Sequence, residues 1–310
     1  SHDILFYDLY PENIFFDGNY YPKINIINNL FILIGNQTRL NDLKASCKPP
    51  ETIINNEFTK QSEVYMFSLI IYEILTNEKP FQNFENKKTL KKEITENNYR
   101  PPMNEKIPEC YQELIQSCWS GNPKERPTFE KIVEILNQDQ RFINGEINKD
   151  EYYKYIDINS KHNFASSSNF KIKKFPILDL YLGALVNIID FSKVNIIGDS
   201  NFTDIFKIKE IKTGNYYGRT LLKTDFEEDK LFYRKLNIIR KINHPLFLKF
   251  IGYSPFDFNN QPNPIIINEF NSICTLQSLL ENERKGINND NWNSTTKLVT
   301  IYGIASGMKF

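Results

Sequence analysis

The spacing of apolar residues divides the chain into a helix-rich first half and a strand-rich second half. Residues 4–34 alternate short apolar runs with turns, which predicts a hairpin of short strands. Residues 62–77 are apolar on nearly every helical face, so they predict a helix that is buried on all sides. Two further helices are predicted at 108–119 and 127–137, because each of these stretches opens with a proline.

The second half carries the patterns of strands, with helices among them. Between the halves, residues 141–186 are mostly charged and polar, and we interpret about 159–186 as a linker. From residue 187 onward, strands are predicted at 190–198, 202–210, 215–224, 248–254 and 264–270, and helices at 226–242, 275–285 and 294–310.

Composition narrows the classes of partner. Lys and Arg total 38, as do Asp and Glu, so the formal net charge of the 310 residues is zero. A neutral chain has no global field that favours nucleic acid or an anionic membrane, and we expect neither as a partner. No apolar run approaches the ~20 residues that span a bilayer, and the first residues predict no signal peptide.

The four cysteines are scattered along the chain, without paired spacing and without a neighbouring histidine. This pattern predicts neither a disulfide framework nor a zinc site, and it favours a reducing compartment. We therefore expect a cytoplasmic protein. The cysteines are Cys47, Cys110, Cys118 and Cys274.

Four motifs follow one another in the first half: YDLYPENIFFD at 7–17, PPE at 49–51, SEVYMFSLIIYEILTNEKPF at 62–81 and IPECYQELIQSCWSGNPKERPTF at 107–129. In this order they resemble the catalytic loop, the end of the activation segment, the central buried helix and the closing helices of a protein-kinase domain. The resemblance implies a buried ion pair between Glu51 and Arg126. The sequence around Cys118-Trp119 and the RPTF motif most resembles that of the tyrosine-kinase-like group of kinases, as found in protists.

Five motifs of the second half are IIGDSNFTDIF at 196–206, YYGRTLLK at 216–223, NHPLFLKFIGYSPF at 243–256, PIIINEF at 264–270 and WNSTTKLVTIYGIASGMKF at 292–310. They resemble the front of a kinase domain. By this resemblance they stand at the glycine-rich loop, the lysine strand, the segment after the small-lobe helix, the strand and hinge that hold adenine, and the helix before the catalytic loop.

These resemblances imply an α+β, protein-kinase-like fold whose helical large lobe comes first in the chain. We expect a large-lobe part at 1–140, a tail and linker at 141–186, and a small-lobe part at 187–310 with five strands and one helix. Two arrangements are open: a piece that spans two tandem kinases, or a circularly permuted kinase. Because 62–77 and 294–310 each carry apolar faces that need cover, we expect these two helices to pack together.

The resemblance also implies a phosphotransfer site whose cofactors would be ATP and Mg²⁺. Asp8 and Asn13 remain as remnant catalytic residues, and Asn13 is the remnant Mg²⁺ ligand. An alternative role for Asp8 is to cap its loop by hydrogen bonding to the backbone. The remnant ATP pocket is expected to consist of Phe15, Gly198, Ile205, Gly218, Lys223, Glu269 and Phe270.

Most other groups of such a site are replaced. Ser200 and Thr203 stand where glycines would let the backbone approach phosphate. Thr220 stands at the strand lysine and Lys235 at its glutamate partner, and residues 26–28 supply no aspartate for Mg²⁺. Removing one preorganised charge-stabilising group often costs ~3 kcal/mol of barrier. We therefore expect ATP and Mg²⁺ binding, and any activity, to be weak or absent.

The catalytic loop itself has changed. Phe6 and Tyr7 stand for its His and Arg, and Tyr10 stands for its lysine. Glu63 replaces the aspartate that holds this loop in the family, and its extra methylene is expected to loosen that contact.

From these residues we predict a pseudokinase that acts by binding or scaffolding protein partners, with tandem kinase neighbours as one class of partner. The first alternative is a weakly active, ATP-dependent Ser/Thr-type kinase that uses Asp8, Asn13 and Lys223. The second is a non-autonomous piece of a tandem kinase. The family resemblance alone implies protein phosphorylation.

Overall fold

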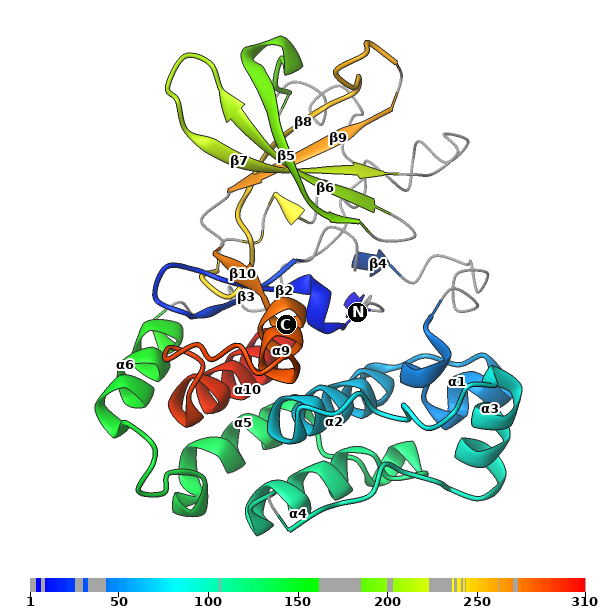
Figure 1. Cartoon of the computed structure of the whole chain (residues 1–310). Coiled ribbons are helices and arrows are strands. Elements are labelled where there is room, and N and C mark those ends of the chain that lie inside the picture. Colours follow the sequence, from blue (N-terminus) through cyan, green and yellow to red (C-terminus); the bar gives the residue numbers. More distant parts are fainter. Residues whose placement is uncertain are drawn as a thin grey trace.

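The computed structural model of the chain has a strand-rich part above a helix-rich part (Figure 1). The helix-rich part comes mainly from the first half of the chain and the sheet from the second, which confirms the predicted α+β class. The structure describes residues 4–6, 9–25, 30–32, 43–105, 107–161, 185–199, 203–222, 236, 239–240, 242, 244–261, 263–269 and 273–309.

Five antiparallel strands form the main sheet, in the order β5-β6-β7-β9-β8. Along β9, Ile265 and Ile267 pack with Phe191 and Ile208 in a small cluster, whereas Ile266 belongs to the main core. This alternation follows from the two-residue repeat of a strand, so the sheet buries apolar residues on both faces. The strands are β5 Phe191–Asp199, β6 Thr203–Glu210, β7 Tyr216–Leu222, β8 Phe250–Ser254 and β9 Ile265–Glu269.

Two smaller sheets lie between the main sheet and the helices (Figure 1). The first pairs β1, Ile4–Phe6, with β4, Leu30–Ile32. In the second, β2, Ile14–Phe16, pairs with β3, Pro22–Ile24, as the hairpin prediction requires. Its third strand is β10, Cys274–Thr275, which comes from the other half of the chain. The second sheet therefore joins the two halves.

Helix α2, Lys60–Thr76, forms the centre of the helix-rich part. It begins at a capping box between Thr59 and Ser62, which satisfies backbone groups that a helix end leaves open. It ends at Asn77, whose φ of 59° is left-handed. The other helices that the sequence predicted are α4 Glu109–Cys118, α5 Phe129–Gln138, α9 Leu276–Arg284 and α10 Ser294–Met308.

Helix α10 packs against α2 and α5, and its residues from Thr295 to Met308 are almost all buried. The expected packing of 294–310 against 62–77 is therefore confirmed. The core that these helices share extends to Tyr253 and Ile266 in the main sheet, so both halves of the chain contribute to one apolar core. None of the helices in the described ranges is long and apolar enough to cross a membrane.

Three helices lie where no helix was predicted: α1 Pro50–Asn55, α3 Lys87–Glu96 and α6 Lys149–Ser160. Helix α6 belongs to the stretch whose polar composition suggested a tail. Its Tyr152 and Tyr155 are nevertheless buried and lie edge-on to Tyr302 of α10, at centroid distances of 5.9 and 6.2 Å. Two inward tyrosines three residues apart are too few to form a clear apolar periodicity. The helix expected at 226–242 lies mostly outside the described residues.

Candidate functional site

The catalytic-loop position is built on the single turn Pro11–Asn13. Asn13 is buried, its backbone N–H bonds the Tyr10 carbonyl at 2.9 Å, and its own carbonyl accepts from the Asn25 N–H at 2.9 Å. The turn is therefore bonded to Asn25, the residue directly after β3. Asp8 and the expected metal-aspartate position, 26–28, lie outside the described residues.

Glu63 of α2 hydrogen-bonds the backbone directly before this loop. Its carboxylate is fully buried and accepts a short hydrogen bond from the Phe6 N–H. The expectation that the longer side chain would loosen this contact is therefore wrong. Lys60, one helical turn earlier, explains part of the difference, because its ammonium lies 3.3 Å from the carboxylate and 5.3 Å from the Phe6 ring centroid. A nearby cation lowers the cost of burying the Glu63 charge.

A second lysine lies on the outer side of the same loop. The Lys44 N–H donates to the Tyr10 hydroxyl at 3.1 Å, and the Lys44 ammonium lies 4.6 Å from the Tyr10 ring centroid and pairs with Glu12. Tyr10, which replaces the loop lysine of the family, is itself buried. Lys44 thus fastens the segment before Ala45–Cys47 to this loop.

The main sheet places several pocket residues in register. Gly198 of β5 lies opposite Ile205 of β6, and Ile205 lies opposite Thr220 of β7. Gly218 of β7 is buried and lies opposite Asn268 of β9. The sheet therefore brings Gly198, Ile205 and Gly218 into one region, with Thr220 on the same strand as Gly218. Lys223 lies outside the described residues.

Glu269, at the end of β9, was predicted to line the ATP pocket. Its carboxylate accepts from the Lys23 ammonium at 3.2 Å and from the Lys249 N–H at 3.2 Å. Lys23 also donates to the carbonyl of Pro245 at 3.3 Å. The side chain of Glu269 therefore joins β9 to β3 of the helix-rich part. Sequence reasoning missed Lys23, because nothing near it in the chain indicates a partner 246 residues away.

Phe15 of β2 is buried, as a residue that closes a pocket would be, and its strand lies between β3 and β10. Its backbone neighbours are Lys23 on β3 and Thr275 on β10. Phe270, the next residue expected in the pocket, lies outside the described residues. Lys23 thus links Phe15 to Glu269. It lies opposite Phe15 in the strand register, and its side chain binds the Glu269 carboxylate.

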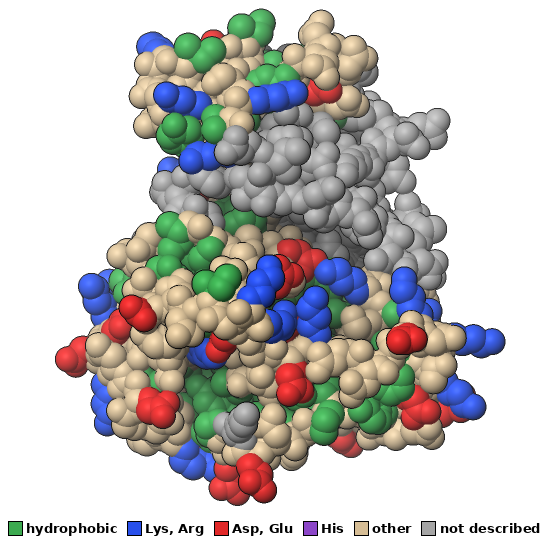
Figure 2. All heavy atoms as spheres, in the orientation of Figure 1, with side chains coloured by type: hydrophobic (Ala, Val, Ile, Leu, Met, Phe, Trp, Pro, Cys, Tyr) green, Lys and Arg blue, Asp and Glu red, His purple; other side chains and the backbone are tan. Residues whose placement is uncertain are grey.

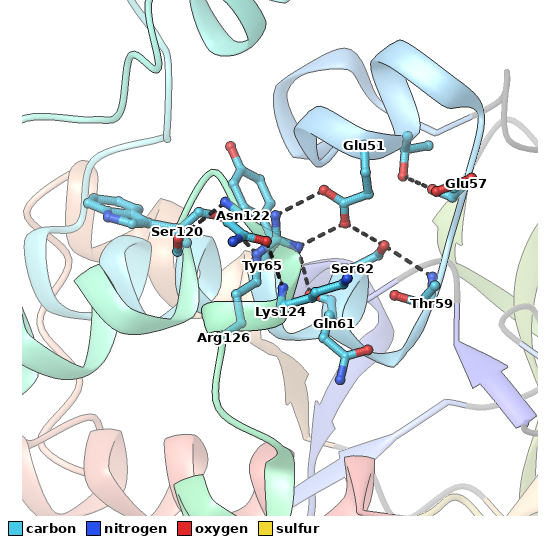
Figure 3. A network of polar contacts seen from close by, with 12 residues as sticks. Glu51, Glu57, Thr59, Gln61, Ser62, Tyr65, Ser120, Asn122, Lys124 and Arg126 are labelled. Atoms are coloured by element: carbon cyan, nitrogen blue, oxygen red, sulfur yellow. Dashed lines mark hydrogen bonds and ion pairs between the residues drawn. The ribbon is translucent and has the colours of Figure 1, made fainter.

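A buried polar network joins Glu51 of α1 to Arg126, as the resemblance implied (Figure 3). The guanidinium donates to both carboxylate oxygens of Glu51, at 2.8 and 2.9 Å. It also donates to the carbonyls of Gln61, at 2.8 Å, and Ser120, at 2.9 Å. The Ser62 hydroxyl donates to Glu51 at 2.6 Å. Every polar atom of this buried pair is therefore engaged from several segments.

Thiol chemistry has little support in the described part of the chain. Burial raises the pKa of the Cys47 thiol to about 12, and burial does the same for Cys118. Burial also raises the pKa of Cys274, to about 11. A thiolate is the reactive form of cysteine, so these three side chains stay protonated and unreactive near neutral pH.

Metal ligands are equally sparse within these ranges. No three His, Cys, Asp or Glu side chains of the described residues gather where they could hold a metal ion. Asn13 supplies one amide oxygen, whereas Mg²⁺ is usually bound through one or two carboxylates together with phosphate. The described residues therefore fit a Mg²⁺–nucleotide site poorly.

Comparison with known proteins finds kinases that are similar to part of this chain. Residues 35–136 match the family model described as protein tyrosine and serine/threonine kinase. Dual specificity protein kinase shkE of Dictyostelium discoideum is 33% identical over 89 residues, which are 29% of this chain and 12% of that protein. Cyclic GMP-binding protein C of the same organism is 40% identical over 91 residues, 29% of this chain and 4% of that protein.

A mammalian kinase is also similar to part of the chain. Mitogen-activated protein kinase kinase kinase 7 of Bos taurus is 26% identical over 137 residues, 43% of this chain and 24% of that protein. The chain thus spans less than a quarter of the length of each of these relatives. Together with the five-stranded sheet above a helical part, these matches support a protein-kinase-like chain.

Proposed function

We propose that the chain is a catalytically degenerate, kinase-like protein that acts by binding other proteins. The observation that carries the proposal is the register of β7, which puts Thr220 opposite Ile205 and Ile266. The resemblance expects a phosphate-binding lysine there, and a threonine hydroxyl cannot supply its positive charge. Membership of the tyrosine-kinase-like group, and the division at 1–140, 141–186 and 187–310, are parts of the same proposal.

Two further features support it. The elements that maintain the fold are intact: the Glu51–Arg126 network is fully bonded and α2 is buried from Ser62 to Ile74. Groups near the chemical site serve structural contacts instead, since Glu269 binds Lys23 and Lys44 binds Tyr10 and Glu12. A protein that keeps its framework and redirects its polar groups in this way is suited to recognition.

The test is thermal unfolding with and without Mg²⁺-ATP, together with a phosphotransfer assay. A ligand present at about 100 times its Kd stabilises a protein by about 2.7 kcal/mol, which shifts the melting temperature measurably. We expect no shift at millimolar ATP and no phosphate transfer. The Thr220→Lys variant is the matched comparison, because it restores a cation on the same strand.

The outcome that would contradict the proposal is a Mg²⁺-dependent stabilisation that saturates at micromolar ATP and is lost in Asn13→Ala. That result would favour the second candidate, a weakly active ATP-dependent Ser/Thr-type kinase. The candidate draws on one observation: Asn13 is still held in a rigid turn, between Tyr10 and Asn25.

A further inference from the structure

We propose that one flank of helix α3 is a docking surface for an acidic segment of a partner protein. The inference deepens the proposed function, because a protein that acts by binding needs a surface that selects its partner. Helix α3, Lys87–Glu96, lies at the edge of the helix-rich part beside α1 (Figure 1). Its charged side chains are not distributed evenly.

The charges of α3 separate by sign around the helix axis. At about 100° per residue, Lys87, Lys88 and Lys91 fall on one flank. Glu93 and Glu96 fall on the other. Between these two flanks lies the apolar face of the helix, where Leu90 and Ile94 are buried and only 4% and 1% exposed. In the space-filling view, Lys and Arg side chains appear together with Asp and Glu side chains at the right margin of the lower part, where Figure 1 places α3 (Figure 2).

The three lysines of this flank are exposed. Among the described residues none of them forms an ion pair, whereas Lys92, at the far edge of the lysine group, pairs with Glu96 at 3.7 Å. The helix that carries them is well anchored, since the Asn86 side chain accepts from the N–H groups of Lys88, at 2.8 Å, and Thr89, at 3.4 Å. The flank therefore presents three exposed ammonium groups on an anchored helix.

An apolar residue lies on the neighbouring element. Helix α1, which contacts α3, carries Ile54, and 64% of this side chain is exposed. The segment Ala45–Cys47, at the activation-segment position, also contacts α3. Cations on one helix, and an exposed aliphatic side chain on the helix that contacts it, suit a peptide that carries carboxylates and an apolar residue, because complementary charge gives specificity and apolar contact adds affinity.

Two other anionic partners fit this surface less well. Nucleic acid requires many phosphate contacts over a wide basic field, whereas the chain has no net charge and α3 carries glutamates on its other flank. A membrane-bound helix must insert its apolar face into the lipid, and the apolar face of α3 is already covered by the core. An acidic protein segment is the remaining match.

The test uses fluorescence anisotropy with a labelled peptide of glutamates around a central leucine. The Lys87→Glu/Lys91→Glu variant reverses two charges of the flank, and Lys149→Glu/Lys154→Glu on α6 is the control, with the same change in net charge at two other exposed lysines. We expect the parent to bind with an affinity that falls as salt rises. We expect the α3 variant to lose about tenfold or more and the α6 variant to match the parent.

Circular dichroism shows first that both variants are folded; if the α3 double variant is not, Lys91→Gln alone takes its place. The proposal is overturned if the parent does not bind the peptide, or if both variants bind it equally. It is also overturned if phosphatidylserine vesicles or duplex RNA bind the parent more tightly than the peptide and require the same lysines. None of these readouts involves nucleotide, so Mg²⁺-ATP binding would contradict the pseudokinase proposal and leave the docking result unchanged.

Discussion

Arg126 shows how one side chain can fix several distant segments. It is buried, and its guanidinium reaches Glu51, Gln61 and Ser120, while its Cζ lies 5.1 Å from the Tyr65 ring centroid. Burial raises the pKa of Tyr65 to about 12, so its ring stays neutral beside the cation. A buried cation of this kind is stable only while its carboxylate partner and its carbonyl acceptors are all in place.

Arg126→Ala should therefore lower the free energy of unfolding by about 3–5 kcal/mol, because it leaves the Glu51 carboxylate buried without its cation. The measurement is chemical denaturation. Arg141→Ala is the matched control, since Arg141 also pairs with two carboxylates, those of Glu113 and Asp139, but lies at the surface. Exposed ion pairs contribute little to stability, so the free energy of unfolding of this control should be close to that of the parent. Equal free energies of unfolding for both variants would show that the Arg126 pair does not stabilise the helix-rich part.

Gly303→Ala should destabilise the protein although alanine favours helices. A Cβ at this position in α10 would lie 2.3 Å from the Tyr155 hydroxyl and 2.6 Å from Pro22 Cγ. Overpacking of this kind costs about 1–3 kcal/mol. At Gly145 a Cβ would meet nothing within 4 Å, so Gly145→Ala is the control, expected to be neutral. A Gly303→Ala variant as stable as the parent would mean that α6 is not seated on α10.

At the scale of elements, the junction between β3 and residues 244–249 decides how the sheet sits on the helices. The Ile24 N–H donates to the Leu246 carbonyl at 2.7 Å, and the Leu248 N–H donates to the Ile24 carbonyl at 3.2 Å. Beside these backbone bonds, the Lys23–Glu269 pair is mostly shielded, with 15% and 21% of the two side chains exposed. A short parallel pairing and one ion pair therefore connect elements from opposite halves of the chain.

Lys23→Met should loosen this junction while the helical core stays intact. It removes the cation that binds both Glu269 and the Pro245 carbonyl, and hydrogen bonds to charged groups contribute about 1.5–3 kcal/mol. Hydrogen exchange of the Leu248 amide should then be about tenfold faster or more. Amides inside α2, such as that of Ile70, should exchange as in the parent. Unchanged exchange at Leu248 would mean that the ion pair does not bear on the junction.

For the whole molecule, α10 is what makes the two halves one structure. It comes from the end of the chain, yet it packs against α2 and α5 from the first half, and its Ile304 is fully buried. The β10 strand and the Ile24 pairing add further links between the halves. Unfolding of one half should therefore expose core surface of the other.

Ile304→Ala tests this coupling. Truncation of a buried isoleucine costs about 2–5 kcal/mol, and the loss should appear in a single unfolding transition for both halves. It should also speed hydrogen exchange in α2, more than 200 residues earlier in the chain. Two separate transitions, with α2 unaffected, would indicate halves that fold independently.

The sequence by itself determined the elements whose apolar spacing is long and regular. Buried α2 and α10, the strands of the main sheet and the Glu51–Arg126 pair all followed from local pattern or from motifs in order. Such features are predictable because the residues that define them lie within one element or one recognisable motif.

Tertiary structure alone decided which polar groups meet. Lys23 with Glu269, and Lys44 with Tyr10, are pairs whose members lie far apart in the chain and carry no local periodicity. It also decided that α6 is buried, since two tyrosines gain their partners from α10. It decided that Glu63 still holds the loop, because Lys60 lies close enough to balance its charge. The physical reason is common to all four: the stability of a buried polar or aromatic group depends on neighbours that only the folded chain brings within reach.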